Sequence, residues 1–257
     1  MSSVVPSFTA PEVGRPLEEP RATRRPEALP FGAEGAALLE AIREGRPFYL
    51  ARTERVSLWQ RAFEALVASA VLVLAAPVIL VEALVIRLFT PGPALFRQQR
   101  VGVHGKPFSF VKFRTLYADA RKRFPEMYAY QYDAEEIRKL RFKPVDDPRV
   151  TPQGRWLRKS TLDELPNFWN VLKGEMALVG PRPEIPEMLP YYEGDMLLKF
   201  TVRPGITGLA QVSGRGRLGF LETVAYDVEY VRRKSWRLDL EILLRTIKAV
   251  VLQSGAF

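Results

Sequence analysis

The chain has 257 residues, enough for one large domain with extensions, and its formal net charge is +9. It contains no cysteine and a single histidine, which excludes disulfides, thiolate metal sites and cysteine nucleophiles and disfavours zinc held by histidines. Any chemistry must therefore rest on carboxylates, basic groups, hydroxyls or a metal with oxygen ligands. The positive charge predicts acidic partners: nucleic acid, anionic lipid or phosphorylated substrates.

The start of the chain is polar and rich in proline. Residues 1–30 carry scattered charges and show no apolar periodicity, a composition typical of a disordered tail. Residues 33–45 predict a short helix that ends at Gly45, just before Pro47. We interpret residues 1–50 as a polar N-terminal extension.

The next segment is apolar enough to enter a membrane. No charge interrupts the 17 residues from Ala65 to Val81, although a buried core helix can have the same composition. Arginines flank this run on both sides, and positive charge stays on the cytoplasmic side of a membrane. We therefore expect residues 51–92 to form a re-entrant membrane helix, broken by Pro77, that returns both flanks to one side. A spanning helix kinked at the proline is the alternative.

Residues 93–257 predict a soluble catalytic domain of the α/β class, mostly helical, with one small β-hairpin. The hairpin covers residues 94–116 and turns at His104–Gly105, so the histidine receives no catalytic role. On the returning strand, Lys112 and Arg114 share one face. They form either a solvated basic face or a pair of phosphate ligands.

Two adjacent acids stand out in "KSTLDELPNFWNVLKGE", residues 159–175. Apolar residues at helical spacing predict a helix that ends near Gly174. Thr161 and Glu164 have the form of a capping box, which would make Asp163 and Glu164 ordinary helix-start residues. Pro166 instead favours a helix that begins later and leaves the acids on the preceding turn.

Arginines in turns fixed by glycine or proline favour a reactive site. Four such turns follow one another along the chain, and their arginines are Arg158, Arg182, Arg203 and Arg215. Arginine is the preferred bidentate ligand of phosphate. Together with a carboxylate pair, these residues indicate a site for a di-anionic or pyrophosphate substrate with Mg²⁺.

The C-terminal stretch "YVRRKSWRLDLEILLRTIKAVVL" predicts an amphipathic helix with flanking basic residues. An interfacial membrane helix and a plain core helix both fit this pattern. Its expected apolar stripe is Trp236, Leu240, Leu243, Ile247 and Val251.

The segments "KFRT", "DDPRVTPQGRWLRKSTLDELPNFWNVLKGEMALVGPRPE" and "RPGITGLAQVSGRG" resemble the bacterial sugar transferase family, the monotopic phosphoglycosyl transferases. The resemblance covers residues 57–250 and is to the minimal small form, here with an N-terminal extension. It implies transfer of a sugar-1-phosphate from a UDP-sugar to polyprenol (undecaprenyl) phosphate, with release of UMP. Such a reaction initiates exopolysaccharide, capsule or related glycan biosynthesis at the cytoplasmic face of the bacterial inner membrane. The implied partners are membrane lipids and downstream glycosyltransferases, with no nucleic acid.

The resemblance also implies roles for individual residues. Asp163 would be the nucleophile that forms a phosphosugar-aspartyl intermediate, near or on Mg²⁺, and Glu164 would position the site or assist proton transfer. The family's Ser-Pro at the membrane helix break is Ala76–Pro77 here. The implied phosphate and nucleotide contacts are Lys112, Arg114, Arg158, Arg182, Arg203 and Arg215.

Other functions remain open at this point. A glycosyltransferase that moves only the sugar would release UDP in place of UMP. A membrane scaffold without activity would explain the apolar segment and the charge, but gives no reason for the acids and arginines. A nucleic-acid binder fits neither the apolar run nor arginines framed by proline.

Overall fold

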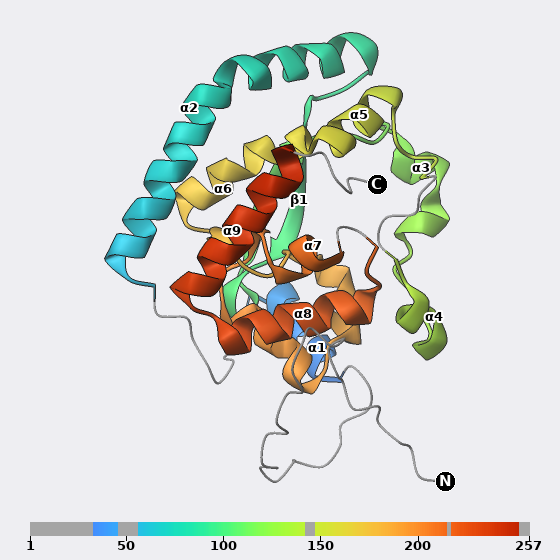
Figure 1. Cartoon of the computed structure of the whole chain (residues 1–257). Coiled ribbons are helices and arrows are strands. Elements are labelled where there is room, and N and C mark those ends of the chain that lie inside the picture. Colours follow the sequence, from blue (N-terminus) through green and yellow to red (C-terminus); the bar gives the residue numbers. More distant parts are fainter. Residues whose placement is uncertain (1–32, 46–55, 142–146, 215–216, 252–257) are drawn as a thin grey trace, which may run out of the picture.

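The computed structural model describes residues 33–45, 56–141, 147–214 and 217–251. Within these ranges the chain is mostly helical, with two small two-stranded sheets (Figure 1). The elements in chain order are α1 (Ala33–Arg43), α2 (Leu58–Phe89), β1 (Leu95–Val101), η1 (Val103–Gly105), β2 (Pro107–Phe113), α3 (Ala120–Arg123), η2 (Pro125–Tyr128), α4 (Ala134–Lys139), α5 (Pro152–Ser160), η3 (Leu162–Asn167), α6 (Phe168–Lys173), β3 (Ala177–Val179), η4 (Pro186–Tyr191), η5 (Gly194–Thr201), β4 (Gly205–Thr207), α7 (Leu209–Gly214), α8 (Phe220–Arg233) and α9 (Trp236–Val251).

The apolar segment forms α2, a single helix of 32 residues that begins after the N-cap Ser57. Its most apolar stretch has a mean hydropathy of 2.6 and is 11% buried, so the alternative of a buried core helix is wrong. The expected break is also absent, because the helix continues through Pro77. Figure 1 shows that α2 bends into two arms instead, and Pro77 supplies a physical cause by removing one helical hydrogen bond.

Both arms of α2 are fastened to the same globular body. On the first arm, Arg61 donates to the Leu172 carbonyl of α6, and Glu64 pairs with Arg203 at 2.6 and 3.1 Å. At the far end, Arg114 donates to the carbonyl and hydroxyl of the C-cap Thr90, at 3.1 and 2.9 Å. The two ends of the apolar helix are thus held by one domain.

The predicted hairpin is confirmed. β1 and β2 pair antiparallel, with Leu95 opposite Phe113 and Val101 opposite Pro107. The connection is the short η1 turn, where His104 has φ 52° and Gly105 has φ 77°. The turn thus places two successive residues in the left-handed region, which is tight enough to close a hairpin.

A second sheet was not predicted. β3 and β4 are parallel strands of three residues each, and Ala177 lies opposite Gly205. They lie in a core that also takes buried side chains from α6, β2, α8 and α9. This core holds the segments on either side of the acid pair in fixed positions.

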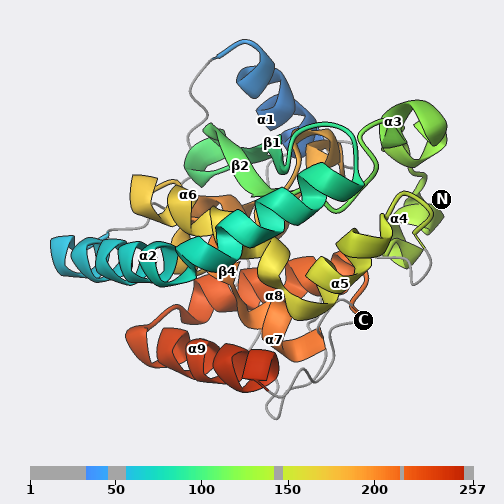
Figure 2. The ribbon, with the colours of Figure 1, turned by 90° about the horizontal axis from the view of Figure 1, so that it is seen from above.

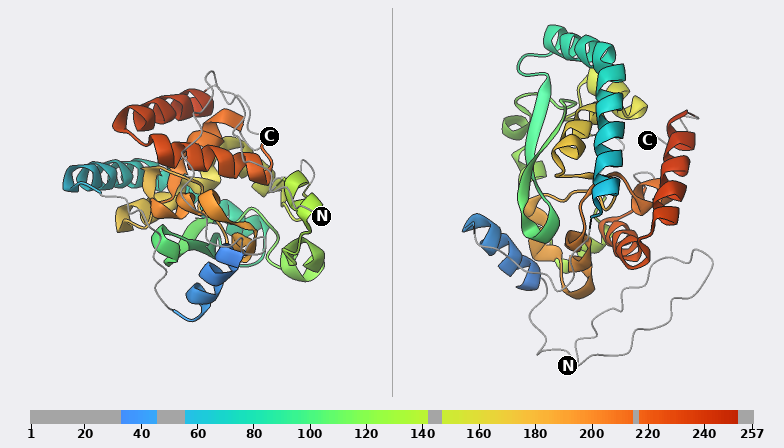
Figure 3. Two further views of the ribbon diagram at one scale, coloured as in Figure 1. Left: turned by 90° about the horizontal axis from the view of Figure 1, so that it is seen from below. Right: turned by 90° about the vertical axis from the view of Figure 1, so that its left-hand side faces the viewer.

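The predicted helix in the N-terminal extension is confirmed as α1, and it packs against η4 on the body. Leu38 is fully buried in a second core with Met188 and Leu189 of η4 and with side chains of α8. The backbone N–H of Gly35 donates to the Tyr192 carbonyl at 3.1 Å. Figures 2 and 3 show α1 and α9 on opposite sides of the molecule.

The C-terminal helix α9 combines the two expected arrangements. Leu238 and Ile242 are buried, and Leu243 of the predicted apolar stripe packs against the same core. A second apolar face lies open and consists of Trp236, Leu240, Leu244, Ile247 and Val250. One face of α9 is therefore a core face, and the other suits the interface of a membrane.

Candidate active site

The acid pair lies on a short 3-10 turn that precedes the helix. η3 carries Asp163 and Glu164, and α6 begins only at Phe168. Thr161 has φ 60° and makes no side-chain capping bond, so the predicted capping box is wrong. Because Thr161 ends α5 in the left-handed conformation, it cannot take the extended conformation of an N-cap.

Asp163 is buried, and Lys112 of β2 lies within its electrostatic reach. Burial lowers the pKa of Lys112 to about 8, although the charge of Asp163 opposes the shift. The same ammonium group also experiences the charges of Arg182, Glu164 and Arg158. The structure therefore places four other predicted site residues within electrostatic range of Lys112.

Arg182 is held by the second acid of the pair. It follows β3 in the "GPRPE" segment, and its Nη2 donates to Glu164 Oε1 at 2.9 Å. The nearby Glu164 carboxylate raises the pKa of Arg182, and burial opposes this effect. Glu164 thus orients an arginine, while Asp163, its neighbour on η3, is the other acid of the site.

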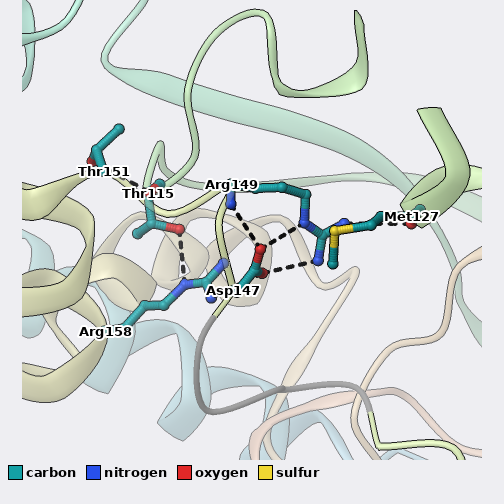
Figure 4. Close-up of polar contacts among 6 residues, drawn as sticks. All are labelled: Thr115, Met127, Asp147, Arg149, Thr151 and Arg158. Atoms are coloured by element: carbon teal, nitrogen blue, oxygen red, sulfur yellow. Dashed lines mark hydrogen bonds and ion pairs between the residues drawn. The ribbon is translucent and has the colours of Figure 1, made fainter. Parts of the chain in front are cut away.

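Arg158 extends from α5, and Thr115 and Asp147 hold its guanidinium in place (Figure 4). Its Nε donates to Thr115 Oγ1 at 3.1 Å, and its Nη1 lies 3.7 Å from Asp147 Oδ2. Burial lowers the pKa of Arg158, whereas the charges of Asp147 and Asp163 oppose this. Arg158 is therefore the cation that links the buried Asp147 to the acid pair.

Arg100 of β1 belongs to the same cluster, although it was not predicted from the sequence. Its Nη1 donates to the Pro183 carbonyl at 3.0 Å, beside Arg182 in the chain. Burial lowers the pKa of Arg100 to about 10, with Glu184 opposing and Arg182 adding to the shift. The alternation of side chains along a strand could have predicted this. Phe96 of β1 pairs with Lys112 of β2, and Arg100 lies on the same face of β1 as Phe96, so Arg100 and Lys112 share one face of the hairpin.

A buried polar network behind the "GPRPE" segment was also missed. Tyr192 donates to Glu184 Oε2 at 2.7 Å, and Lys199 donates to the Tyr192 hydroxyl at 3.1 Å. Lys199 also pairs with Asp227 at 3.0 Å, and burial raises the pKa of Asp227 despite this cation. Because the network joins three separate segments, it fixes the loop that carries Arg182.

Two other predicted residues lie in different surroundings. Arg114 is buried beside Thr90 at the end of α2, so the expectation of a solvated basic face on β2 is wrong. Both terminal nitrogens of Arg203 donate to the Glu64 carboxylate of α2. Arg215 lies outside the described residues. Their predicted contacts with phosphate remain predictions.

A cavity of about 340 Å³ lies between the second arm of α2 and α5. Apolar side chains line it, among them Val81, Val85 and Trp156, and Pro77 lies at its edge on α2. The buried Glu82 also lines the cavity, and it lies within electrostatic range of Asp163. Glu82 thus brings a carboxylate of α2, at the wall of this cavity, within electrostatic range of the acid pair.

The donor set fits a hard divalent cation. Asp163 supplies a buried carboxylate, and neither carboxylate oxygen of Glu82 has a hydrogen-bond partner among the described residues. Within the same ranges, no group of three or more acidic or histidine side chains gathers at one point. Mg²⁺ commonly uses one or two carboxylates and takes its other ligands from water and substrate phosphates, which this arrangement permits. The site as a whole can bind phosphate groups and present one carboxylate to them.

Comparison with known proteins agrees with this chemistry. Residues 55–253 match the family described as bacterial sugar transferase. The chain is 37% identical to the exopolysaccharide production protein ExoY of Rhizobium meliloti over 198 residues, which are 77% of this chain and 88% of that protein. It is 36% identical to the UDP-glucose:undecaprenyl-phosphate glucose-1-phosphate transferase of Caulobacter vibrioides, over 100% of this chain and 91% of that protein. It is 43% identical to the undecaprenyl-phosphate galactose phosphotransferase of Salmonella typhimurium, over 65% of this chain and 35% of that longer protein.

Proposed function

The chain belongs to the bacterial sugar transferase family, and on that premise we propose that it transfers a sugar-1-phosphate from a UDP-sugar to polyprenol phosphate and releases UMP. The observation that supports this most is the cluster of Asp163, Lys112, Arg158 and Arg182 beside a membrane helix. A buried carboxylate among cations suits attack on a diphosphate, because the cations neutralise the charge that repels the nucleophile.

The first step uses Asp163 as the nucleophile. One carboxylate oxygen attacks the β-phosphorus of the UDP-sugar, and the bond from that phosphorus to the bridging oxygen breaks. The electron pair leaves with UMP, and the sugar phosphate stays on Asp163 as an acyl phosphate. Lys112 and Arg158 stabilise the negative charge on the phosphoryl oxygens during this exchange.

The second step regenerates the carboxylate. A phosphate oxygen of the polyprenol phosphate attacks the same phosphorus, and the bond to Asp163 breaks, which yields a polyprenyl diphosphate sugar. Glu164 holds Arg182 in place and can take the proton that a monoprotonated acceptor phosphate loses. Mg²⁺, held by Asp163 together with Glu82, would neutralise the diphosphate and the departing UMP.

We also propose that α2 is re-entrant, although the helix continues through Pro77. Both of its ends contact one globular body, and a spanning helix would separate those ends by about 30 Å of hydrocarbon. The open apolar face of α9 and the exposed Trp59 and Trp156 would lie at the same membrane surface. The isoprenoid chain of the acceptor would then enter the cavity between α2 and α5, at the cytoplasmic face of the inner membrane.

Nucleotide release tests this function. Detergent-purified protein is incubated with Mg²⁺, polyprenol phosphate and a panel of UDP-sugars, and UMP and UDP are quantified separately. We expect catalytic UMP formation that requires the lipid, and its dependence on the sugar identifies the donor. Formation of UDP would instead place the chain among transferases that move only the sugar.

A further inference from the structure

Asp147 is buried between two arginines and lies outside the group of residues that we assign to the reaction. Only 6% of its surface is exposed. Its Oδ1 and Oδ2 accept from Arg149 at 2.8 and 2.9 Å, and its Oδ2 lies 3.7 Å from Arg158 (Figure 4). The carboxylate therefore pairs with one arginine on its own loop and with one on α5.

The two arginines have different surroundings. Arg149 turns away from the acid pair, because its Nη1 donates to the Met127 carbonyl at 3.4 Å and its guanidinium lies 5.1 Å from the ring centre of Tyr128. Arg158 instead experiences the charge of Asp163. A substitution at Asp147 can therefore affect Asp163 through the position of Arg158.

The backbone around Arg158 is built to hold it. Thr151 caps α5 by accepting from the Gly154 N–H at 2.9 Å, and the Thr151 N–H donates to the Thr115 carbonyl at 3.0 Å. A Cβ on Gly154 would lie 2.1 Å from that same carbonyl, so only glycine allows α5 to approach this closely. With Thr115 Oγ1 on Nε and Asp147 beside Nη1, two anchors on different segments fix the guanidinium.

We propose that Asp147 is a positioning residue that orients Arg158 toward the phosphoryl group transferred at Asp163. The proposal rests on the phosphosugar transfer proposed above. A carboxylate on one side of a guanidinium limits its rotation and leaves the remaining N–H groups aimed at the phosphate. The carboxylate also balances two neighbouring cations that would otherwise repel each other.

The test compares two substitutions, one that weakens the contact of Asp147 with Arg158 and one that weakens its contact with Arg149. Asp147→Asn removes the charge beside Arg158, and we expect kcat for UMP release to fall about 10- to 100-fold while KM for polyprenol phosphate stays within about 2-fold. Arg149→Gln removes the other guanidinium that contacts Asp147, keeps the backbone N–H of residue 149 on its Oδ1, and leaves Arg158 paired. We expect this control to lower Tm about as much as Asp147→Asn does, and to leave kcat within about 3-fold of the wild-type value.

A double-mutant cycle with Arg158→Lys completes the test. If Asp147 acts through Arg158, adding Asp147→Asn to Arg158→Lys lowers kcat no further. An equal further loss in that background, or equal losses of kcat in Asp147→Asn and Arg149→Gln, would overturn the proposal. If Asp147→Asn does not fold, the Asp147→Asn/Arg149→Gln double variant, which removes one charge of each sign, replaces it.

The same assay separates this proposal from the function on which it rests. Wild-type protein that releases UDP, or no nucleotide, contradicts both. Wild-type protein that releases UMP, with Asp147→Asn as active as wild type, supports the function and overturns the positioning role alone.

Discussion

At the scale of single residues, the site is a charge cluster whose members come from segments that lie far apart in the chain. Lys112 lies on β2, Arg158 on α5, the acid pair on η3, and Arg182 follows β3. Each cation has its own fixed partner or buried position, so the cluster exists before a substrate binds. A site organised in advance stabilises charge in the transition state without reorganising at that moment.

Lys112 makes the reaction sensitive to pH. Burial lowers its pKa to about 8, so the ammonium form is complete below that value and is lost as pH rises through it. We expect kcat/KM for the UDP-sugar to fall above pH 8, and to fall from a lower pH if a cation at Asp163 lowers the pKa further. Lys112→Arg keeps its charge at all these pH values and should remove the fall up to about pH 9. A wild-type profile that is flat from pH 7 to pH 9.5 would contradict this role.

At the scale of elements, the attachment of α2 depends on a buried ion pair. Glu64 and Arg203 are both more than nine-tenths buried and are joined by two hydrogen bonds. The pair lies between α2 and the segment before β4, so it fixes the angle at which the domain meets the first arm.

Removing one partner of this pair should destabilise the protein strongly. We expect Glu64→Gln or Arg203→Gln to lower the free energy of unfolding by about 3–5 kcal/mol, because each leaves a buried charge without its partner. Thermal unfolding in detergent measures this, and the double variant should be less destabilised than the two single losses added together. Loss of UDP-sugar affinity in a stably folded Arg203→Gln protein would instead favour the phosphate contact predicted from the sequence.

The docking of α1 depends on a glycine. A Cβ at Gly35 would lie 1.8 Å from the Leu189 carbonyl of η4, which no rotamer can relieve. We expect Gly35→Val to release α1, so that hydrogen exchange of residues 33–43 approaches that of an unfolded segment. Ala36→Val places the same side chain on the exposed face of this helix and is the matched control. Equal exchange in both variants would show that the contact with η4 does not hold α1.

Local sequence signals predicted the elements better than the connections between them. The hairpin turn at His104–Gly105 and the helix after residue 33 depend on neighbouring residues, and both were predicted correctly. The partners Glu64 and Arg203 are 139 positions apart, and no local pattern relates them. The prediction of a capping box was wrong because the end of α5, and not the segment that follows, determines the conformation of Thr161.

At the scale of the whole molecule, the bend in α2 and the common attachment of its ends are the basis of the re-entrant arrangement that we propose. The chain has no cysteine, so single-cysteine variants can be labelled without background. Ser57→Cys and Gln99→Cys place exposed thiols before and after α2. We expect an impermeant maleimide to label both from the cytoplasmic side and neither from the outside of intact spheroplasts. Labelling of one from each side would show that α2 spans the membrane.

We propose that Asp163 carries the sugar phosphate during the reaction, and intact-protein mass spectrometry can detect this intermediate. Purified protein is mixed with Mg²⁺ and the accepted UDP-sugar in the absence of polyprenol phosphate, and its mass is measured after rapid quenching. We predict that the mass rises by one sugar phosphate, that added lipid removes the increment, and that Asp163→Asn shows none. An Asp163→Asn protein that still gains the sugar phosphate, or an active wild-type protein that never gains it, would contradict the account.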